Sequence, residues 1–292
     1  MVVILALLLI GYGYYTDRVL PRRDVVFQIG DQKYTYAHLE ERVKSDVAQG
    51  RFNVRDTANS VTATIARMQR EELTRILGEE RGITVSEDEL TAGIRNDLNI
   101  TEELSRNELA PILRDELRSI DLSLDEYLSI VESQVIEEKI KADLTSSLPE
   151  ETEQVNLLFI DAGSQANAIL SLQALEDGTE FAEVAQQYSQ HAASNDDGVL
   201  GWVPREALDP ELADVAFSLD GRSGIIETEK SFYIIDVQGK ETRPIDPGVV
   251  EDIGTQRFNE LLEAAFDETP FIYNLTQGQL IDLANEIGGT FG

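Results

Sequence analysis

The sequence contains no cysteine and only two histidines, His38 and His191, among its 292 residues. Without cysteine the chain has no disulfide, no thiol nucleophile, no iron–sulfur cluster and no cysteine-based zinc site. It also has no glycine-rich phosphate loop, no His-x-x-x-His pair and no acidic calcium-binding loop. We therefore expect neither a metal nor any other cofactor.

Positive charge is also scarce. The chain has 24 Lys and Arg residues against 55 Asp and Glu residues, which gives a formal net charge of −31. Such a surface repels a phosphate backbone, so the composition excludes a nucleic-acid-binding protein. Hydrophobic residues make up 42% of the chain, which is enough to form packed cores and is not typical of a disordered protein. The length predicts about two domains.

One long hydrophobic run is present, at Val2–Ile10, and tyrosines continue it as far as Tyr15. A helix of that length is about 21 Å long, which is shorter than the roughly 30 Å hydrocarbon core of a bilayer. The run lacks the basic start and the small-residue cleavage site of a signal peptide. We expect residues 1–16 to be a membrane anchor or signal segment whose upstream part is missing. The alternative is a buried helix of the protein core.

Helical spacing of apolar residues dominates from residue 25 to Pro149. A short strand is predicted at Val25–Ile29, followed by a turn and by a second strand or helix entry at Lys33–Tyr36. Further features predict helices: a cap at Thr35, an amphipathic pattern from Asn53 to Gly78, and capping boxes at Ser86–Glu89 and Ser123–Glu126. Residues 25–150 are therefore predicted to form a mostly helical module.

After Pro149 the pattern changes to alternating strands and helices. Strands are predicted at Val155–Ile160, Ser223–Glu227 and Ser231–Val237, and helices at Ser164–Glu176, Phe181–Tyr188 and Glu211–Phe217. This order indicates an α+β unit over residues 151–243. An amphipathic helix at Val249–Phe266 and a weakly patterned tail follow, and we expect residues 244–292 to pack on the helical module.

Five motifs follow one another within the α+β unit. They are Glu153-Gln154-Val155, Gly178–Ala185 with Tyr188-Ser189 after it, Gly198–Pro204, Ala216–Leu219 and Phe232–Val237. Their identity and order resemble the parvulin-type (PpiC, rotamase) peptidyl-prolyl isomerase domain. The resemblance implies a four-stranded antiparallel sheet with flanking helices, and an enzyme of the isomerase class.

The helical module is similar to the chaperone part of SurA/PrsA-type foldases, through Gly82–Ser86 and Leu122–Tyr127. This resemblance implies a bacterial, membrane-anchored protein-folding factor outside the cytoplasm, in the cell envelope. Its partners would be unfolded or exported polypeptides, and the membrane through the N-terminal segment. The arginines Arg18, Arg22 and Arg23 by themselves favour a cytoplasmic location for that side, which conflicts with export. A basic tail upstream of Met1 would resolve the conflict.

The family's chemistry is rotation about an Xaa–Pro bond, over a barrier of about 20 kcal/mol, with no covalent intermediate. The resemblance implies a polar cluster with one histidine in the first strand and one in the last. Leu157 and Tyr233 occupy these two positions here, and His191 replaces a Cys or Asp. Thr228 matches the family pattern. The apolar pocket for the proline ring corresponds to Leu208, Leu212 and Phe217.

These replacements indicate a degenerate active site. A leucine neither donates nor accepts a hydrogen bond, Tyr233 carries its hydroxyl on a longer stem, and His191 is neither an acid nor a thiol. We expect strongly reduced or absent isomerase activity, with client binding retained. Two alternatives stay open: an active isomerase with a rewired site using His191 and Tyr233, and an accessory structural subunit of a membrane complex.

Overall fold

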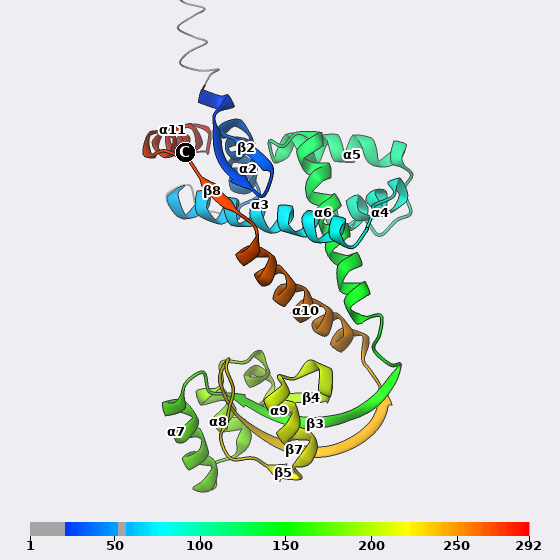
Figure 1. The fold of residues 1–292 in the computed structure, drawn as a ribbon, viewed down its shortest axis with the longest axis vertical. Helices are drawn as coiled ribbons and strands as arrows, with labels where there is room; N and C mark the ends of the chain where they lie inside the picture. The colour runs from blue at the N-terminus through cyan, green and yellow to red at the C-terminus, as the bar shows by residue number, and fades with distance from the viewer. Residues whose placement is uncertain (1–20, 52–56, 292) are drawn as a thin grey trace, which may run out of the picture. The chain divides into compact units, whose positions relative to one another are not determined.

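The computed structural model describes residues 21–51 and 57–291, which divide into two compact units. The first unit takes in the residues up to Ala142 together with those from Phe258 onward, and the second is Asp143–Arg257. The boundaries fall inside helices α6 (Leu124–Thr145) and α10 (Pro247–Glu268) (Figure 1). The expected anchor at residues 1–16 lies outside the described residues. Within the described ranges, no helix combines the length and the apolar character needed to cross a membrane.

The first unit combines helices with a small antiparallel sheet. Its strands are β1 (Val25–Ile29), β2 (Gln32–Thr35) and β8 (Phe271–Tyr273), in the order β2-β1-β8. Its helices, besides parts of α6 and α10, are η2 (Pro21–Arg23), α2 (Tyr36–Ala48), α3 (Thr57–Glu80), α4 (Glu87–Asp97), α5 (Arg106–Ser119) and α11 (Gln277–Phe291). The tail is therefore more regular than its weak pattern predicts, because the short strand β8 is stabilised by pairing with β1, which lies far away in the sequence.

The predicted helix starts are confirmed where a side chain caps the helix. Thr35 is the N-cap of α2, and its hydroxyl accepts the backbone N–H of His38. At α4 the Ser86 hydroxyl accepts the N–H of Glu89, while the Glu89 carboxylate accepts the N–H of Ser86 at 2.8 Å. Such contacts satisfy N–H groups that have no partner inside the helix, which explains why these starts are visible in the sequence.

A buried ion network joins three helices of this unit. The Arg42 side chain on α2 is only 3% exposed. Its guanidinium donates two hydrogen bonds to Glu71 on α3, at 2.6 and 3.0 Å, and a third to Glu126 on α6, at 3.1 Å. A planar guanidinium matches a carboxylate with two parallel bonds, so Arg42 sets the relative placement of α2, α3 and α6.

The second unit is built on an antiparallel sheet, and its fold is α+β. The strands are β3 (Glu151–Asp161), β4 (Val199–Pro204), β5 (Gly221–Arg222), β6 (Ile226–Glu227) and β7 (Phe232–Pro244). They lie in the order β4-β3-β7-β5, and β6 also pairs with β7. The helices are α7 (Gln165–Glu176), α8 (Phe181–Tyr188) and α9 (Pro210–Ser218), with short 3-10 turns η3 (Ala192–Asp196) and η4 (Arg205–Ala207) (Figure 1).

The prediction of one strand at Ser223–Glu227 is wrong in its first half: only Ile226–Glu227 is a strand (β6), and the short strand β5 precedes the predicted range. Ser223 donates its N–H to the carbonyl of Ile235 at 2.8 Å, and its hydroxyl accepts the N–H of Ile235 at 3.0 Å. The side chain thus takes the place of a backbone carbonyl, and the ladder is interrupted between β5 and β6. The position beside β7 that was expected for a single fourth strand is therefore occupied by two short strands, β5 and β6.

The two faces of this sheet carry separate apolar clusters, as strand alternation requires. One face, with Leu157 and Phe159 of β3, packs against Leu212 and Ala216 of α9. The opposite face packs against α7 and α8. The candidate site lies on the first of these faces.

Candidate functional site

Leu157 lies inside the apolar cluster of the α9 face. Its side chain is fully buried, and its position on β3 is directly opposite Val237 on β7. Tyr233 lies opposite Asp161, four residues further along β3. The two positions where the family pattern has histidines therefore share one face, but they are not cross-strand neighbours.

Tyr233 brings a hydroxyl to this face at the edge of the apolar cluster. The hydroxyl donates to Oδ2 of Asp209 over 3.4 Å, which is long for an O–H···O hydrogen bond and therefore weak. Asp209 also forms an ion pair with Lys230 at 2.7 Å. Burial raises the pKa of Tyr233, the negative charges of Asp209 and Asp161 raise it further, and a hydrogen bond with Thr228 acts in the opposite direction. Tyr233 is therefore a neutral hydrogen-bond donor.

His191 is the N-cap of the η3 turn. Its Nδ1 accepts the backbone N–H of Ala193 at 3.1 Å, so the neutral ring carries its proton on Nε2. The ring meets Phe159 edge-on, with 5.0 Å between the ring centroids and 79° between the planes. The centroid of Phe159 also lies 5.4 Å from that of Tyr233.

Phe159 thus contacts both candidate polar residues, and sequence reasoning did not select it. The signal was present in the alternation of β3, which places residue 159 on the same face as Leu157. Asp209 was missed as well, and no local pattern in the sequence identifies it, because it meets Tyr233 from 24 residues away.

Thr228 lies in the turn that joins β6 to β7. Its hydroxyl accepts the N–H groups of Lys230 and Ser231, both at 3.2 Å. Its own N–H donates to the carbonyl of Ser231 at 3.0 Å. The Ser231 hydroxyl in turn donates to Asp161. Thr228 therefore holds the turn that positions the start of β7 and with it Tyr233.

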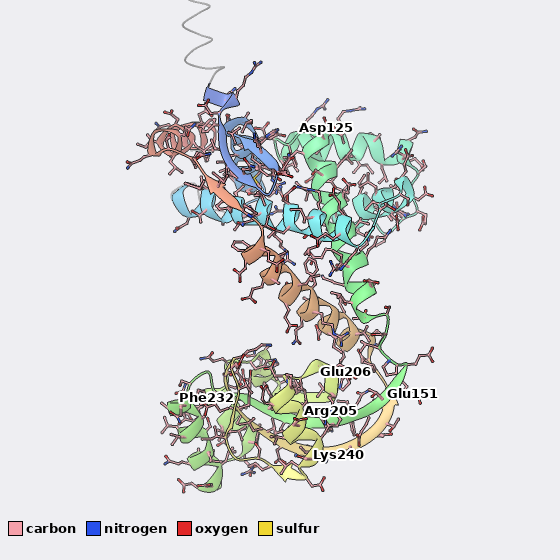
Figure 2. All side chains as sticks on the ribbon, viewed as in Figure 1. Asp125, Glu151, Arg205, Glu206, Phe232 and Lys240 are labelled. Atoms are coloured by element: carbon pink, nitrogen blue, oxygen red, sulfur yellow. The ribbon has the colours of Figure 1, made fainter. Side chains whose placement is uncertain are left out.

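The three predicted pocket residues, Leu208, Leu212 and Phe217, all belong to the same cluster as Leu157 and Tyr233. Leu212 is buried, whereas Leu208 and Phe217 are half-buried. The guanidinium of Arg205 lies 4.8 Å from the centroid of the Phe217 ring. Figure 2 shows Arg205 and Glu206 on the segment that leads from β4 towards α9.

The face as a whole is a packed apolar cluster, with the buried hydroxyl-bearing side chain of Tyr233 and the half-buried imidazole of His191 at its border. In the part of the chain that the structure describes, no group of three or more His, Asp or Glu side chains is arranged to hold a metal ion.

Comparisons with known proteins agree with this geometry. The family model described as PPIC-type PPIASE domain matches residues 137–241. The chain is 38% identical over 77 residues to the peptidyl-prolyl cis-trans isomerase pin4 of Neurospora crassa, covering 24% of this chain and 58% of the relative. It is 32% identical over 95 residues to the PIN4 isomerase of Gibberella zeae, covering 30% of this chain and 71% of the relative.

A longer match includes part of the helical unit. The foldase protein PrsA of Caldanaerobacter subterraneus subsp. tengcongensis is 26% identical over 195 residues, which cover 65% of this chain and 61% of the relative. The chain thus spans less than two thirds of this relative and of the Neurospora protein. The matched motifs, the antiparallel sheet and the shared apolar face agree with one another, and the chain belongs to the family of proteins with a PPIC-type peptidyl-prolyl isomerase domain.

Proposed function

We propose that this protein is a foldase whose isomerase-type unit binds Xaa–Pro segments but rotates them slowly or not at all. The observation that carries the proposal is the environment of Leu157. It is fully buried among apolar side chains at a position where the family pattern has a histidine. A leucine there supplies no hydrogen bond to a twisted amide.

Binding depends on a different set of residues. Leu208 and Phe217 are half-buried beside the buried Leu212, and covering their exposed apolar surface with a proline ring is favourable whether or not the bond then rotates. Loss of the polar cluster therefore reduces the rate without removing the affinity. This combination suits a unit that holds client chains.

A second candidate is an active isomerase with a rewired site. The specific observation in its favour is that Phe159 brings His191 and Tyr233 to one border of the face. The hydroxyl of Tyr233 and the Nε2–H of His191 are both donors. The nitrogen of a twisted amide can accept a hydrogen bond, because its lone pair no longer conjugates with the carbonyl group. An isomerase assay separates the two candidates.

We further propose that the protein works outside the cytoplasm, anchored by its N-terminal segment, with unfolded or exported polypeptides as clients. The apolar run at Val2–Ile10 supports the anchor, and the 195-residue match to a protein named foldase supports the clients. Flotation of the full chain with lipid vesicles, compared with a chain lacking residues 1–16, tests the anchor. Equal flotation of both chains would contradict it. A role as an accessory subunit predicts instead that the chain purifies in mild detergent with other membrane proteins.

The isomerase proposal is tested by restoring the family residues. The full chain is assayed with a chromogenic Ala-Ala-Pro-Phe peptide, alongside the double variant Leu157→His and Tyr233→His. We expect a rate close to the uncatalysed one for the unmodified chain and a higher rate for the double variant. The matched control is Leu158→His, which places the histidine on the same strand but on the opposite face. A rate for the unmodified chain that equals an intact parvulin would overturn the proposal.

A further inference from the structure

Strand β8 lies at one edge of the sheet in the first unit, and among the described residues it pairs only with β1. Asn274 donates its N–H to the carbonyl of Val26 at 2.8 Å, and Gly30 donates to the carbonyl of Pro270 at 2.9 Å. In an antiparallel pair, alternate residues bond to the neighbouring strand. Ile272 lies midway between the two bonded positions of β8 and therefore faces β1 with its backbone.

The same alternation directs the N–H and C=O groups of Phe271 and Tyr273 away from β1. The side chains of this strand are exposed as well: 40% for Phe271, 47% for Ile272 and 50% for Tyr273. The Phe271 ring lies 6.3 Å from that of Phe27 and 6.4 Å from that of Tyr273, so the aromatic rings form a row. An apolar edge with outward backbone groups is a template for one more strand.

The opposite edge of the sheet is formed by β2, and it is less suited than β8 to pairing with a further strand. Strand β2 exposes Gln32 and Lys33, and a lysine on an edge discourages pairing with another strand. Strand β8 carries no such charge within its own three residues. The β2 edge is therefore protected, whereas no further strand pairs with the outer edge of β8 among residues 21–51 and 57–291.

The charge around β8 identifies the partner's chemistry. From residue 258 to the end, the sequence has no Lys, Arg or His, but it has six acidic residues: Glu260, Glu263, Asp267, Glu268, Asp282 and Glu286. Of these, Glu286 forms ion pairs with Arg22 and Lys44, so the charge that bears on a partner is that of the acidic residues that precede the strand. Glu263, Asp267 and Glu268, which immediately precede the strand, are exposed. Basic residues on a partner are attracted to this region, whereas a second copy of this chain, with its own charge of −31, is repelled.

We propose that β8 is a docking edge for an extended apolar segment of a client polypeptide that is flanked by Lys or Arg. The segment adds a strand to the sheet by bonding to the backbone of Phe271 and Tyr273, and its side chains lie against their rings. The proposal rests on the proposed function as a foldase, and it assigns client binding to a surface separate from the Xaa–Pro site.

The first test is amide hydrogen exchange on the full chain. The probe is a synthetic peptide of alternating Val and Thr with two Lys residues at each end. We expect the amides of Phe271 and Tyr273 to exchange rapidly in the free protein and to be protected by the peptide. The amide of Ile272, which bonds to β1, is expected to be protected in both states. No protection of Phe271 and Tyr273 at saturating peptide would overturn the proposal.

The second test distinguishes peptide binding through the backbone of Tyr273 from binding through its ring. Tyr273→Ala removes the ring but keeps the N–H, whereas Tyr273→Pro also removes the outward N–H without touching a bond to β1. We expect the proline variant to bind the peptide about tenfold more weakly than the alanine variant. Equal affinities of two folded variants would contradict strand addition. The exchange experiment needs no variant and decides the question if the proline variant unfolds.

Further outcomes identify other occupants of the edge. Protection of Phe271 and Tyr273 in the free protein at every concentration would mean that the chain covers its own edge. Protection that grows together with a doubling of the mass would mean a second copy. Equal binding of a peptide with Glu in place of Lys would show that charge does not select the partner. Each of these three results would overturn the proposal. If the proposal about isomerase activity fails, the peptide results are expected to stay the same, because β8 and Leu157 belong to different units. Measuring peptide binding by the double variant Leu157→His and Tyr233→His checks this directly.

Discussion

The ring of His191 meets the ring of Phe159 edge-on at 5.0 Å, and Phe159 is also in contact with Tyr233. One phenylalanine therefore joins the two polar residues that border the apolar face. It fills space between them without providing a hydrogen bond. Phe159 therefore places the two polar residues at one border of the face, where substitution of both tests whether they contribute to the rate.

The polar residues of the border are expected to contribute little to the rate. We predict that Tyr233→Phe combined with His191→Ala leaves the rate of proline isomerisation by the full chain unchanged. Because the hydrogen bond from Tyr233 to Asp209 spans 3.4 Å, Tyr233→Phe alone is expected to change the free energy of unfolding by less than about 1 kcal/mol. A tenfold fall in the rate, about 1.4 kcal/mol of activation free energy, would favour the rewired enzyme instead.

Arg42 is expected to be important for the stability of the helical unit. Arg42→Met leaves the carboxylates of Glu71 and Glu126 without their buried partner. Breaking such a buried pair costs about 3 to 5 kcal/mol of unfolding free energy, which urea denaturation measures. Arg114→Met, on the exposed side of α5, is the control and should stay within about 0.5 kcal/mol. An equal effect of the two changes would contradict the network.

Gly78 allows α3 and α6 to approach closely. A Cβ atom at this position would lie 2.5 Å from Cγ2 of Ile136. In an exposed helix Gly→Ala is stabilising, but here we predict that Gly78→Ala costs about 1 to 3 kcal/mol through overpacking. The control is Gly78→Ala combined with Ile136→Ala, which removes the clashing methyl. The double variant should be more stable than the sum of the single changes predicts, and strict additivity would refute the clash.

Glu89 should make the free energy of unfolding depend on pH under acidic conditions. Hydrogen bonds from Lys139 and then from Ser86 hold the pKa of the Glu89 carboxyl at about 2, against an ordinary value of 4.5. Since the folded pKa lies below the unfolded one, this contribution is complete above pH 4.5 and is lost as the pH falls towards 2.

We therefore expect Glu89→Gln to reduce the dependence of unfolding free energy on pH within that window. Asp88→Asn, which removes the same charge from the same helical turn, is the matched control. NMR titration of the Glu89 carboxyl provides the direct measurement. A midpoint near 4.5 would contradict the prediction.

Local features were predictable from the sequence alone. Helix α8 begins at Phe181 and ends at Tyr188 as predicted, and β1 has the predicted bounds. Thr35 and Ser86 start their helices as predicted, because a cap is a contact between residues three positions apart. The family resemblance assigned Leu208, Leu212 and Phe217 to an apolar pocket; the structure places them in one cluster, and their role in binding a proline ring stays a prediction.

Contacts between distant residues were not predictable in this way. Strand β8 has three residues, which is too few for an alternating pattern, and it exists because β1 pairs with it. The division between β5 and β6 depends on the side chain of Ser223 bonding to Ile235, twelve residues away. Asp209 reaches Tyr233 only because α9 begins beside β7.

The chemistry that this chain lacks follows from its residue composition. Without cysteine there is no thiol, with two histidines outside the strands there is no histidine pair in the sheet, and a charge of −31 repels nucleic acid. These conclusions need only the identities of the residues. Which residues come into contact depends on the folded chain: Phe159 lies against both His191 and Tyr233, and β8 is the last strand of its sheet in the described part of the chain. Strand register and helix packing set those contacts, and both depend on the whole folded chain.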